Sequence, residues 1–286
     1  MREEAGAKVN LCLEVTGKLP DGYHGVRGIM QSLDFGDTVE LEPGPGPWRV
    51  KSDLSYLPEG GDNLAARAAV LFRRLTGLGP EGGTITLTKR IPVCGGFGGG
   101  SSDAAAVLRL LNREYGSPLS WEDLETHSLE LGADVPFCVR GGTALAEGKG
   151  ERLSPLPDLR GADVVLCRPD FLCSTQELFR AIDRLKQRLK PDVPGMVRAV
   201  EEGDLPGVAR RMFNVFEAAL TRSQAQQVES LKSTLLDAGA LGAAMTGSGS
   251  GVFALFADPD TARAAAERLR SQGVKAEQTV TTPRLG

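Results

Sequence analysis

The stretch PVCGGFGGGSSDAA, residues 92–105, decides how this chain folds. Before it, residues 84–88 alternate threonine with Ile85 and Leu87, a pattern typical of a half-buried strand, and residues 104–112 after it are rich in helix formers. Glycine has no Cβ, so the backbone N–H groups of such a loop can approach an anion closely, and the N-terminus of a following helix adds about half a unit of positive charge. The stretch therefore predicts a phosphate-binding loop between a strand and a helix.

The spacing of the glycines separates this loop from two common nucleotide-binding motifs. No lysine follows the last glycine, as it would in a Walker loop, and the glycines do not have the G-x-G-x-x-G spacing of a dinucleotide site. Ser101 or Ser102 is in a position to cap the helix while its hydroxyl faces a phosphate oxygen or a magnesium ion. From the residues alone, a flexible glycine linker or a plain strand-to-helix turn stays open as the alternative.

The same stretch resembles the second signature of the GHMP superfamily, which contains galactokinase, homoserine kinase, mevalonate kinase and phosphomevalonate kinase, and whose loop wraps the phosphates of ATP. It departs from that signature at Phe97, where leucine is usual, and at Gly95, where alanine is common, and neither change alters the glycine scaffold. The resemblance implies an ATP-dependent kinase in which Mg²⁺ arrives with the ATP, and no protein ligands to a metal are predicted. The ATP-binding residues that it implies are Gly95, Gly96, Gly98, Gly99, Gly100, Ser101, Ser102 and, with weaker support, Asn63.

Two segments near the N-terminus indicate which branch of the superfamily the chain resembles. AKVNLCL, residues 7–13, and DGYH, residues 21–24, resemble the branch of the superfamily whose substrate is cytidine-diphosphate methylerythritol. Taken alone, a lysine in an apolar strand is more often a side chain that extends to solvent, and a histidine after a turn is more often structural. The resemblance instead implies that Lys8 is catalytic, that Asn10 binds substrate, and that Tyr23 and His24 recognise cytosine.

Phe179 matches the family position that supplies an aromatic ring opposite the tyrosine, so the resemblance implies that it grips the other side of the base. A phenylalanine in a helix can equally face the core, and the residues alone leave both interpretations open.

LGADVPF, residues 131–137, places an acid between apolar neighbours, where an unpaired carboxylate is costly. By composition alone Asp134 could be a cap or turn residue beside Gly132 and Pro136. The segment matches a motif of the superfamily branch, and the resemblance implies that Asp134 is the general base that accepts the proton of the substrate hydroxyl, with Lys8 as its ion-pair partner.

MTGSGSGVF, residues 245–253, is a second glycine-rich turn that runs into a strand. It resembles the third signature of the superfamily, with Ser250 where proline is frequent, and a plain flexible turn is the alternative. The resemblance places this segment beside the substrate and the phosphate loop, with Gly247 and Ser248 as substrate-binding residues.

The fold that the resemblance implies is α+β with two domains and an active site in the cleft between them. We predict an N-terminal ATP-binding domain over residues 1–154 and a C-terminal domain over residues 155–286, with Pro155 and Pro157 marking the linker. The hydrophobic patterns predict the following elements: strands over residues 8–15, 29–35, 84–88, 143–146, 163–167 and 252–256, and helices over residues 63–75, 104–112, 121–131, 176–190, 197–202, 224–236 and 261–270.

Composition excludes several classes of protein. A formal charge of −4 over 286 residues argues against a protein whose main partner is nucleic acid, and no apolar run approaches the ~20 residues of a membrane span. The first residues carry no signal or transit pattern, so the expected compartment is the cytoplasm. Five cysteines without a C-x-x-C pair are expected to be buried thiols, and no oligomeric state is predicted.

Two other functions compete with this interpretation. One is a GHMP kinase that acts on a mevalonate-type or amino-alcohol substrate, for which the DGYH segment has no purpose. The other is a catalytically silent nucleotide-binding or regulatory protein on the same fold, against which the retention of both Lys8 and Asp134 speaks.

Overall fold

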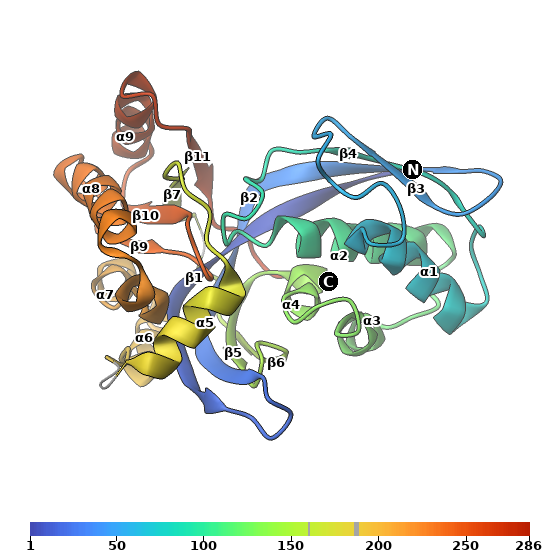
Figure 1. Ribbon diagram of the computed structural model, residues 1–286, viewed down its shortest axis with the longest axis horizontal. Helices are drawn as coiled ribbons and strands as arrows, with labels where there is room; N and C mark the ends of the chain where they lie inside the picture. Colours follow the sequence, from blue (N-terminus) through green and yellow to red (C-terminus); the bar gives the residue numbers. More distant parts are fainter. Residues whose placement is uncertain (160, 186–188) are drawn as a thin grey trace.

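The computed structural model describes residues 1–159, 161–185 and 189–286, and Figure 1 shows the arrangement of its elements. Within these residues the strands form two sheets, of seven and of four strands. The strands are β1 (Arg2–Lys18), β2 (His24–Pro43), β3 (Arg49–Ser52), β4 (Gly83–Thr88), β5 (Thr143–Glu147), β6 (Arg152–Leu156), β7 (Asp163–Cys167), β8 (Phe213–Asn214), β9 (Gly242–Met245), β10 (Val252–Phe256) and β11 (Ala276–Val280). The helices are α1 (Leu64–Thr76), α2 (Gly99–Glu114), α3 (Trp121–Ser128), α4 (Val135–Arg140), α5 (Thr175–Arg184), α6 (Val193–Glu201), α7 (Leu205–Arg210), α8 (Arg222–Asp237), α9 (Pro259–Ser271) and a 3₁₀ turn, η1 (Val215–Ala219).

The seven-stranded sheet is built on the long antiparallel pair β1 and β2. One half of β2 continues the sheet to β4 and then to β3, and its other half pairs with β5, which pairs with β6. Along β1, side chains alternate between the two faces of the sheet, so Lys8 and Asn10 share one face while Val9 and Leu11 pack into the core on the other. This alternation brings the polar residues of an otherwise apolar strand to one side.

Helices α1 and α2 pack on each other and cover one face of this sheet (Figure 1). Their inward residues join sheet residues such as Leu41 and Leu87 in one apolar cluster that contains Phe72 and Leu108. Both ends of α1 are capped. The Asn63 side chain accepts a hydrogen bond from Ala65 N at the start of the helix, and Gly77 adopts a left-handed conformation at its end.

The four-stranded sheet is antiparallel in the order β11, β7, β10, β9, and α8 and α9 pack against it. Segments from the second half of the chain also contribute to the first, seven-stranded sheet. Strand β8 pairs with β1, and Thr281 and Arg284, beyond β11, bridge back to Leu33 and Gly141. In Figure 1 the C-terminus accordingly lies beside α4, among elements formed by the N-terminal part of the chain.

Several sequence-based expectations need correction. Pro155, predicted in a linker, lies in β6 and pairs with Ala144, so the predicted linker is partly strand; the division at residue 154 stays a prediction. The helix predicted over residues 176–190 ends at Arg184, because Leu185 is extended, and residues 186–188 of that prediction lie outside the described residues. Cys94 is exposed and Cys173 partly so, because both belong to loops at the site described below. None of the described helices is long and apolar enough to cross a membrane.

Candidate active site

The glycine-rich loop begins after β4 and ends in the first turn of α2. Gly96 and Gly98 have φ values of 78° and 77°, a left-handed conformation that favours glycine. Helix α2 starts at Gly99 with Gly98 as its N-cap and, in this part of the described chain, no side-chain cap. The prediction that Ser101 or Ser102 caps the helix is therefore wrong, because both residues already lie inside its first turn.

The first turn of α2 presents backbone N–H groups that the helix itself does not use. The intrahelical bonds begin where Ser102 N donates to Gly98 O at 2.9 Å, so the N–H groups of Gly99, Gly100 and Ser101 precede them. These groups and the N-terminal end of the helix dipole favour an anion there. Ser102 points elsewhere: its hydroxyl is buried and donates to the carbonyl of Gly6 at 2.6 Å.

A cavity of about 400 Å³ lies along this loop. It is lined by all of the predicted ATP-binding residues except Ser102. Asn63 lines it as well, but its side chain is engaged in capping α1 and in donating to Pro58 O at 3.0 Å. Asn63 therefore lines the cavity, but its side-chain amide is already hydrogen-bonded within the protein.

The segment of residues 245–253 packs against the glycine-rich loop through backbone contacts. Gly251 N donates to Gly95 O at 2.9 Å, and a Cβ on Gly96 would lie 2.2 Å from the carbonyl oxygen of Thr246. The two glycine-rich segments are thus in direct backbone contact. The alternative of a plain flexible turn over residues 245–253 does not fit this packing.

Lys8 connects the loop to the neighbouring cleft. Its backbone N–H donates to Phe97 O at 2.9 Å, and its stem packs so closely that a Cβ on Gly98 would lie 2.9 Å from Lys8 Cγ. Its Nζ donates to Asn10 Oδ1 at 2.9 Å, and the same oxygen accepts from Gly247 N at 3.2 Å. The strand β1, the phosphate loop and the third signature therefore meet at one buried ammonium group.

Asp134 is the partner of this ammonium group. It stands at the N-cap position of α4, but its side chain makes no capping bond among the described residues, and its Oδ2 lies 3.3 Å from Lys8 Nζ. The side chain of Lys8 is 4% exposed, while that of Asp134 is 37% exposed. The predicted ion pair is present, and the carboxylate faces open space.

That space is a second cavity, of about 980 Å³. Lys8, Asn10, Asp134 and the remaining predicted substrate residues Tyr23, His24, Phe179, Gly247 and Ser248 all line it. Ser101, Thr175 and Ser248 line both this cavity and the one along the glycine-rich loop, so the two adjoin. We call the larger one the acceptor cavity and the smaller one the nucleotide cavity.

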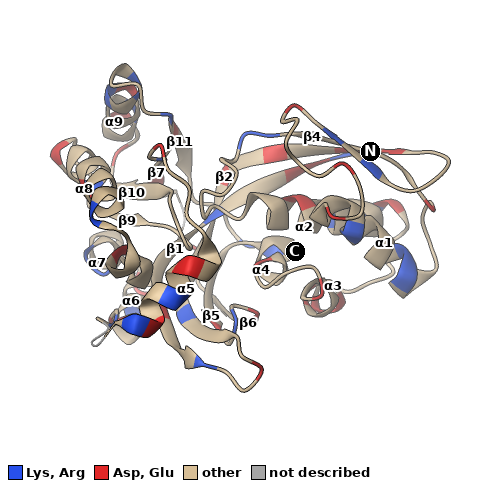
Figure 2. Cartoon of the chain, in the orientation of Figure 1, with Lys and Arg blue, Asp and Glu red and all other residues tan. Residues whose placement is uncertain are grey.

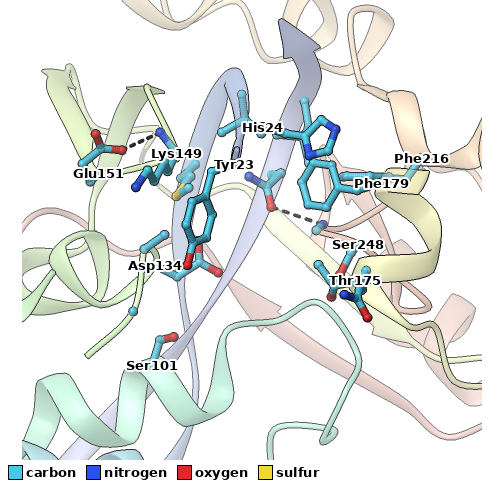
Figure 3. A pocket seen from close by; sticks show the side chains of 18 of the residues that line it. Tyr23, His24, Ser101, Asp134, Lys149, Glu151, Thr175, Phe179, Phe216 and Ser248 are labelled. Carbon is cyan, nitrogen blue, oxygen red and sulfur yellow. Dashed lines mark hydrogen bonds between the residues drawn. The ribbon is translucent and has the colours of Figure 1, made fainter. Parts of the chain in front are cut away.

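The aromatic residues that line the acceptor cavity do not form a single pair of facing rings: His24, Phe179 and Phe216 lie together, and Tyr23 lies apart from them (Figure 3). The His24 ring stacks on Phe179, with 4.5 Å between centroids, and its Nε2 lies 3.0 Å from Asp183 Oδ1. Phe179 is only partly buried, and its other contact is edge-on with Phe216, so it is a cavity residue and not simply a core residue. Tyr23 is 63% exposed, and the ammonium of Lys149 lies 4.2 Å from its ring centroid.

Sequence patterns missed several residues that line the site. Thr175 Oγ1 lies 2.6 Å from Ser248 Oγ at the junction of the two cavities, and Lys149 and Asp183 hold Tyr23 and His24. The sequence offered only weak signals for them. Lys149 lies between two glycines, Gly148 and Gly150, and Thr175 directly follows the N-cap serine of α5.

A buried cluster of charges stands behind the nucleotide cavity. Lys89 Nζ donates to Asp103 Oδ2 at 2.6 Å and to Asp37, whose other oxygen accepts from the backbone N–H of Arg90 and of Ile91. Burial raises the pKa of Asp103 to about 7, against the pull of Lys89 in the opposite direction. The cluster ties β2, the segment after β4 and the first turns of α2 together behind the loop.

Comparison with known proteins agrees with this geometry. Residues 63–142 match the GHMP kinases N terminal domain and residues 196–275 the GHMP kinases C terminal domain. The chain is 38% identical over 272 residues to a protein of Clostridium botulinum (strain Hall) named 4-diphosphocytidyl-2-C-methyl-D-erythritol kinase, covering 95% of this chain and 96% of that one. A protein of the same name from Clostridium beijerinckii is 38% identical over 90% of this chain and 91% of its own.

Solved structures give the same picture. A crystal structure of 4-(cytidine 5'-diphospho)-2C-methyl-D-erythritol kinase superposes with a TM-score of 0.81 at 34% identity, covering 98% of this chain and 99% of that one. Homoserine kinase from Cytophaga hutchinsonii, at 22% identity, has a TM-score of 0.75 over 99% of this chain and 95% of its own, which shows the shared fold. The match in sequence and structure over nearly the whole length means that this chain belongs to the 4-diphosphocytidyl-2-C-methyl-D-erythritol kinase family of GHMP kinases.

Proposed function

We propose that this protein transfers the γ-phosphoryl group of ATP to the 2-hydroxyl of 4-diphosphocytidyl-2-C-methyl-D-erythritol, giving the 2-phosphate and ADP, a step of the non-mevalonate route to isoprenoid precursors. The observation that carries the proposal is the Lys8–Asp134 pair, which lines the acceptor cavity while the Lys8 stem packs against Gly98 of the nucleotide cavity. An alcohol in one cavity and a triphosphate in the other would meet beside this pair.

The chemistry that the pair supplies is proton acceptance and charge stabilisation. Asp134, half-exposed toward the cavity, accepts the proton of the attacking hydroxyl, and the Lys8 ammonium stabilises negative charge that develops on the hydroxyl oxygen and on the transferred phosphoryl group. Phosphoryl transfer needs little covalent help from the protein, so the main task of the site is to align the hydroxyl with the phosphorus.

The loop residues hold the donor. The N–H groups of Gly99, Gly100 and Ser101 bind phosphate oxygens, and the left-handed Gly96 and Gly98 let the backbone approach them closely. Mg²⁺ would arrive with the phosphates of ATP, and the Ser101 hydroxyl, which lines both cavities, would be its protein donor. The ion supplies charge neutralisation between the phosphates when bound.

The aromatic end of the acceptor cavity binds the cytosine. Tyr23 offers an exposed ring face, and the stacked rings of His24 and Phe179 offer a second aromatic surface. Lys149 and Asp183 hold Tyr23 and His24 in these positions.

The test is coupled ADP release with ATP-magnesium and one of four acceptors: 4-diphosphocytidyl-2-C-methyl-D-erythritol, mevalonate, homoserine or galactose. We expect turnover only with the cytidine-linked acceptor. Turnover with one of the other three would mean that the protein is a kinase with a different acceptor. It would reject the proposed acceptor and the role of Tyr23, His24 and Phe179 in binding cytosine. No turnover with any of them would reject the proposal in favour of a silent nucleotide-binding protein.

A further inference from the structure

A third cavity, outside the two described above, lies against α1. Its volume is about 400 Å³, within the usual range for small-molecule sites. Trp48, Val70, Arg67 and Arg74 line it together with Glu130 and Leu131. Figure 2 shows the basic residues of α1 on the half of the molecule away from the four-stranded sheet.

We propose that this cavity is a second ligand site, for a small amphipathic anion with a flat apolar body, and that it is coupled to Asp134 through Glu130 and Leu131. The site does not depend on which alcohol the kinase phosphorylates.

The apolar part of the site comes from one helix face and one buried indole. Val70 is 58% exposed on α1 although it lines the cavity, and Trp48 is only 5% exposed. The Trp48 Nε1 is buried, and no hydrogen-bond acceptor among the described residues reaches it. Because this atom is closed to solvent, Trp48 contributes apolar surface to the cavity and not its N–H group.

The charged part of the site selects an anion. Arg67 donates to the carbonyl of Glu130 at 3.1 Å, and Arg74 pairs with the Glu130 carboxylate at 2.5 Å. This Arg74–Glu130 pair is solvent-exposed, with side chains 58% and 52% exposed, so it stabilises the protein by little. Arginine binds carboxylates through two parallel hydrogen bonds, so a ligand carboxylate can replace that of Glu130 without a large cost.

The coupling follows from the position of Glu130 and Leu131. Both residues line this cavity and the acceptor cavity, so they form part of a wall between the two. Asp134 lies three residues after Leu131, on the same short segment that leads into α4. A ligand that releases Glu130 from Arg74 would shift this wall and with it the Lys8–Asp134 pair.

The probe for the test is 2-naphthoate, a flat aromatic carboxylate, and the reporter is the tryptophan fluorescence of the full-length chain. The chain has two tryptophans, and Trp121→Phe leaves Trp48 as the only tryptophan, which excitation at about 295 nm selects over the three tyrosines. We expect saturable quenching, with weaker binding for the neutral analogue 2-naphthalenemethanol. Arg74→Ala should weaken binding of the acid by about tenfold, the loss of one charge-assisted contact. The matched control is Arg263→Ala, because the Arg263 side chain on α9 has the same 58% exposure and also pairs with an acid.

A second variant guards against misfolding as the cause. Val70→Asp adds a negative charge at the cavity and should weaken naphthoate binding, whereas Leu236→Asp, at an exposed position on α8, should not. Equal binding by Arg74→Ala and Arg263→Ala, or displacement of naphthoate by ATP, would overturn the proposed site. Saturating naphthoate should change turnover at saturating ATP and acceptor, and this change should vanish in Arg74→Ala. Binding without any effect on turnover would overturn the coupling.

Discussion

The Nζ of Lys8 lies 3.3 Å from Asp134 Oδ2, although the two residues are far apart along the chain. The lysine is buried against the glycine-rich loop, and the aspartate is open to the acceptor cavity. The ion pair with the buried Lys8 ammonium group fixes the Asp134 carboxylate at the wall of the acceptor cavity, where a bound alcohol can reach it. This arrangement is what a proton acceptor beside a phosphoryl donor needs.

Asp134→Asn removes the proton acceptor and keeps the shape of the side chain. We expect kcat to fall by a factor of ~10² to 10⁴, the usual contribution of a general base, while ATP affinity stays within about twofold. Steady-state ADP release gives kcat, and a separate nucleotide titration gives the affinity. Asp260→Asn on α9, a residue that lines neither cavity, is the matched control and should leave both values unchanged. Near-normal turnover of Asp134→Asn would exclude its role as base.

Gly96 and Gly100 both belong to the glycine-rich loop, but the structure predicts opposite results for alanine at the two positions. A Cβ on Gly96 would lie 2.2 Å from the carbonyl oxygen of Thr246 on a left-handed backbone, whereas one on Gly100 would meet only Leu64 Cδ1 at 3.7 Å. We expect Gly96→Ala to lower the free energy of unfolding by about 2 kcal/mol or more. Gly100→Ala, inside α2, should be neutral or slightly stabilising. Denaturant unfolding of both variants tests this, and equal losses would contradict the packing described.

Phe179→Leu removes an aromatic face but keeps an apolar side chain. Since stacking of a base on an aromatic ring is worth about 1–3 kcal/mol, we expect the KM for the cytidine-linked acceptor to rise by about tenfold. The KM for ATP should not change, because Phe179 does not line the nucleotide cavity. An equal rise in both KM values would mean that the variant disturbs the fold and not the base site.

The buried Asp103 predicts a dependence of stability on pH. Its ordinary pKa of 3.8 applies in the unfolded chain, and burial raises its pKa to about 7 in the fold. The folded state therefore binds this proton more tightly, and the contribution of Asp103 to stability is lost as pH rises from about 4 to about 7. Asp103→Asn cannot titrate, so its free energy of unfolding should fall less than that of the wild type over this range. Urea unfolding between pH 4.5 and pH 8.5 measures the difference, and a difference that is constant with pH would contradict the raised pKa.

The sequence predicted well those features that depend on local motifs. The glycine-rich loop and its following helix come from a short segment whose residue types and order are specific. The approach of Lys8 to Asp134 joins distant segments, and it was expected from the resemblance to the GHMP superfamily and not from a local pattern. Every predicted site residue except Ser102 lines one of the two cavities, but Thr175, Lys149 and Asp183 line them without having been predicted.

Features set by contacts between distant segments could not be predicted in the same way. The Ser102 hydroxyl turns to the carbonyl of Gly6 because β1 passes beneath α2, and Pro155 joins a strand because β5 lies beside it. The stacking of His24 on Phe179 depends on how α5 sits against the β1–β2 hairpin. Each of these needs the three-dimensional arrangement, which no local pattern encodes.

The most direct test of the account is the position of the phosphoryl group on the product. C2 of the methylerythritol carries a methyl group and no hydrogen, so a phosphate on its oxygen should give a proton-coupled ³¹P signal without three-bond P–H splitting, beside the intact diphosphate signals. We predict this unsplit resonance as the only new phosphomonoester when the protein acts on 4-diphosphocytidyl-2-C-methyl-D-erythritol with ATP. A resonance split by neighbouring protons would place the phosphate on another hydroxyl, whose carbon carries hydrogen, and contradict the placement of the 2-hydroxyl at Lys8 and Asp134.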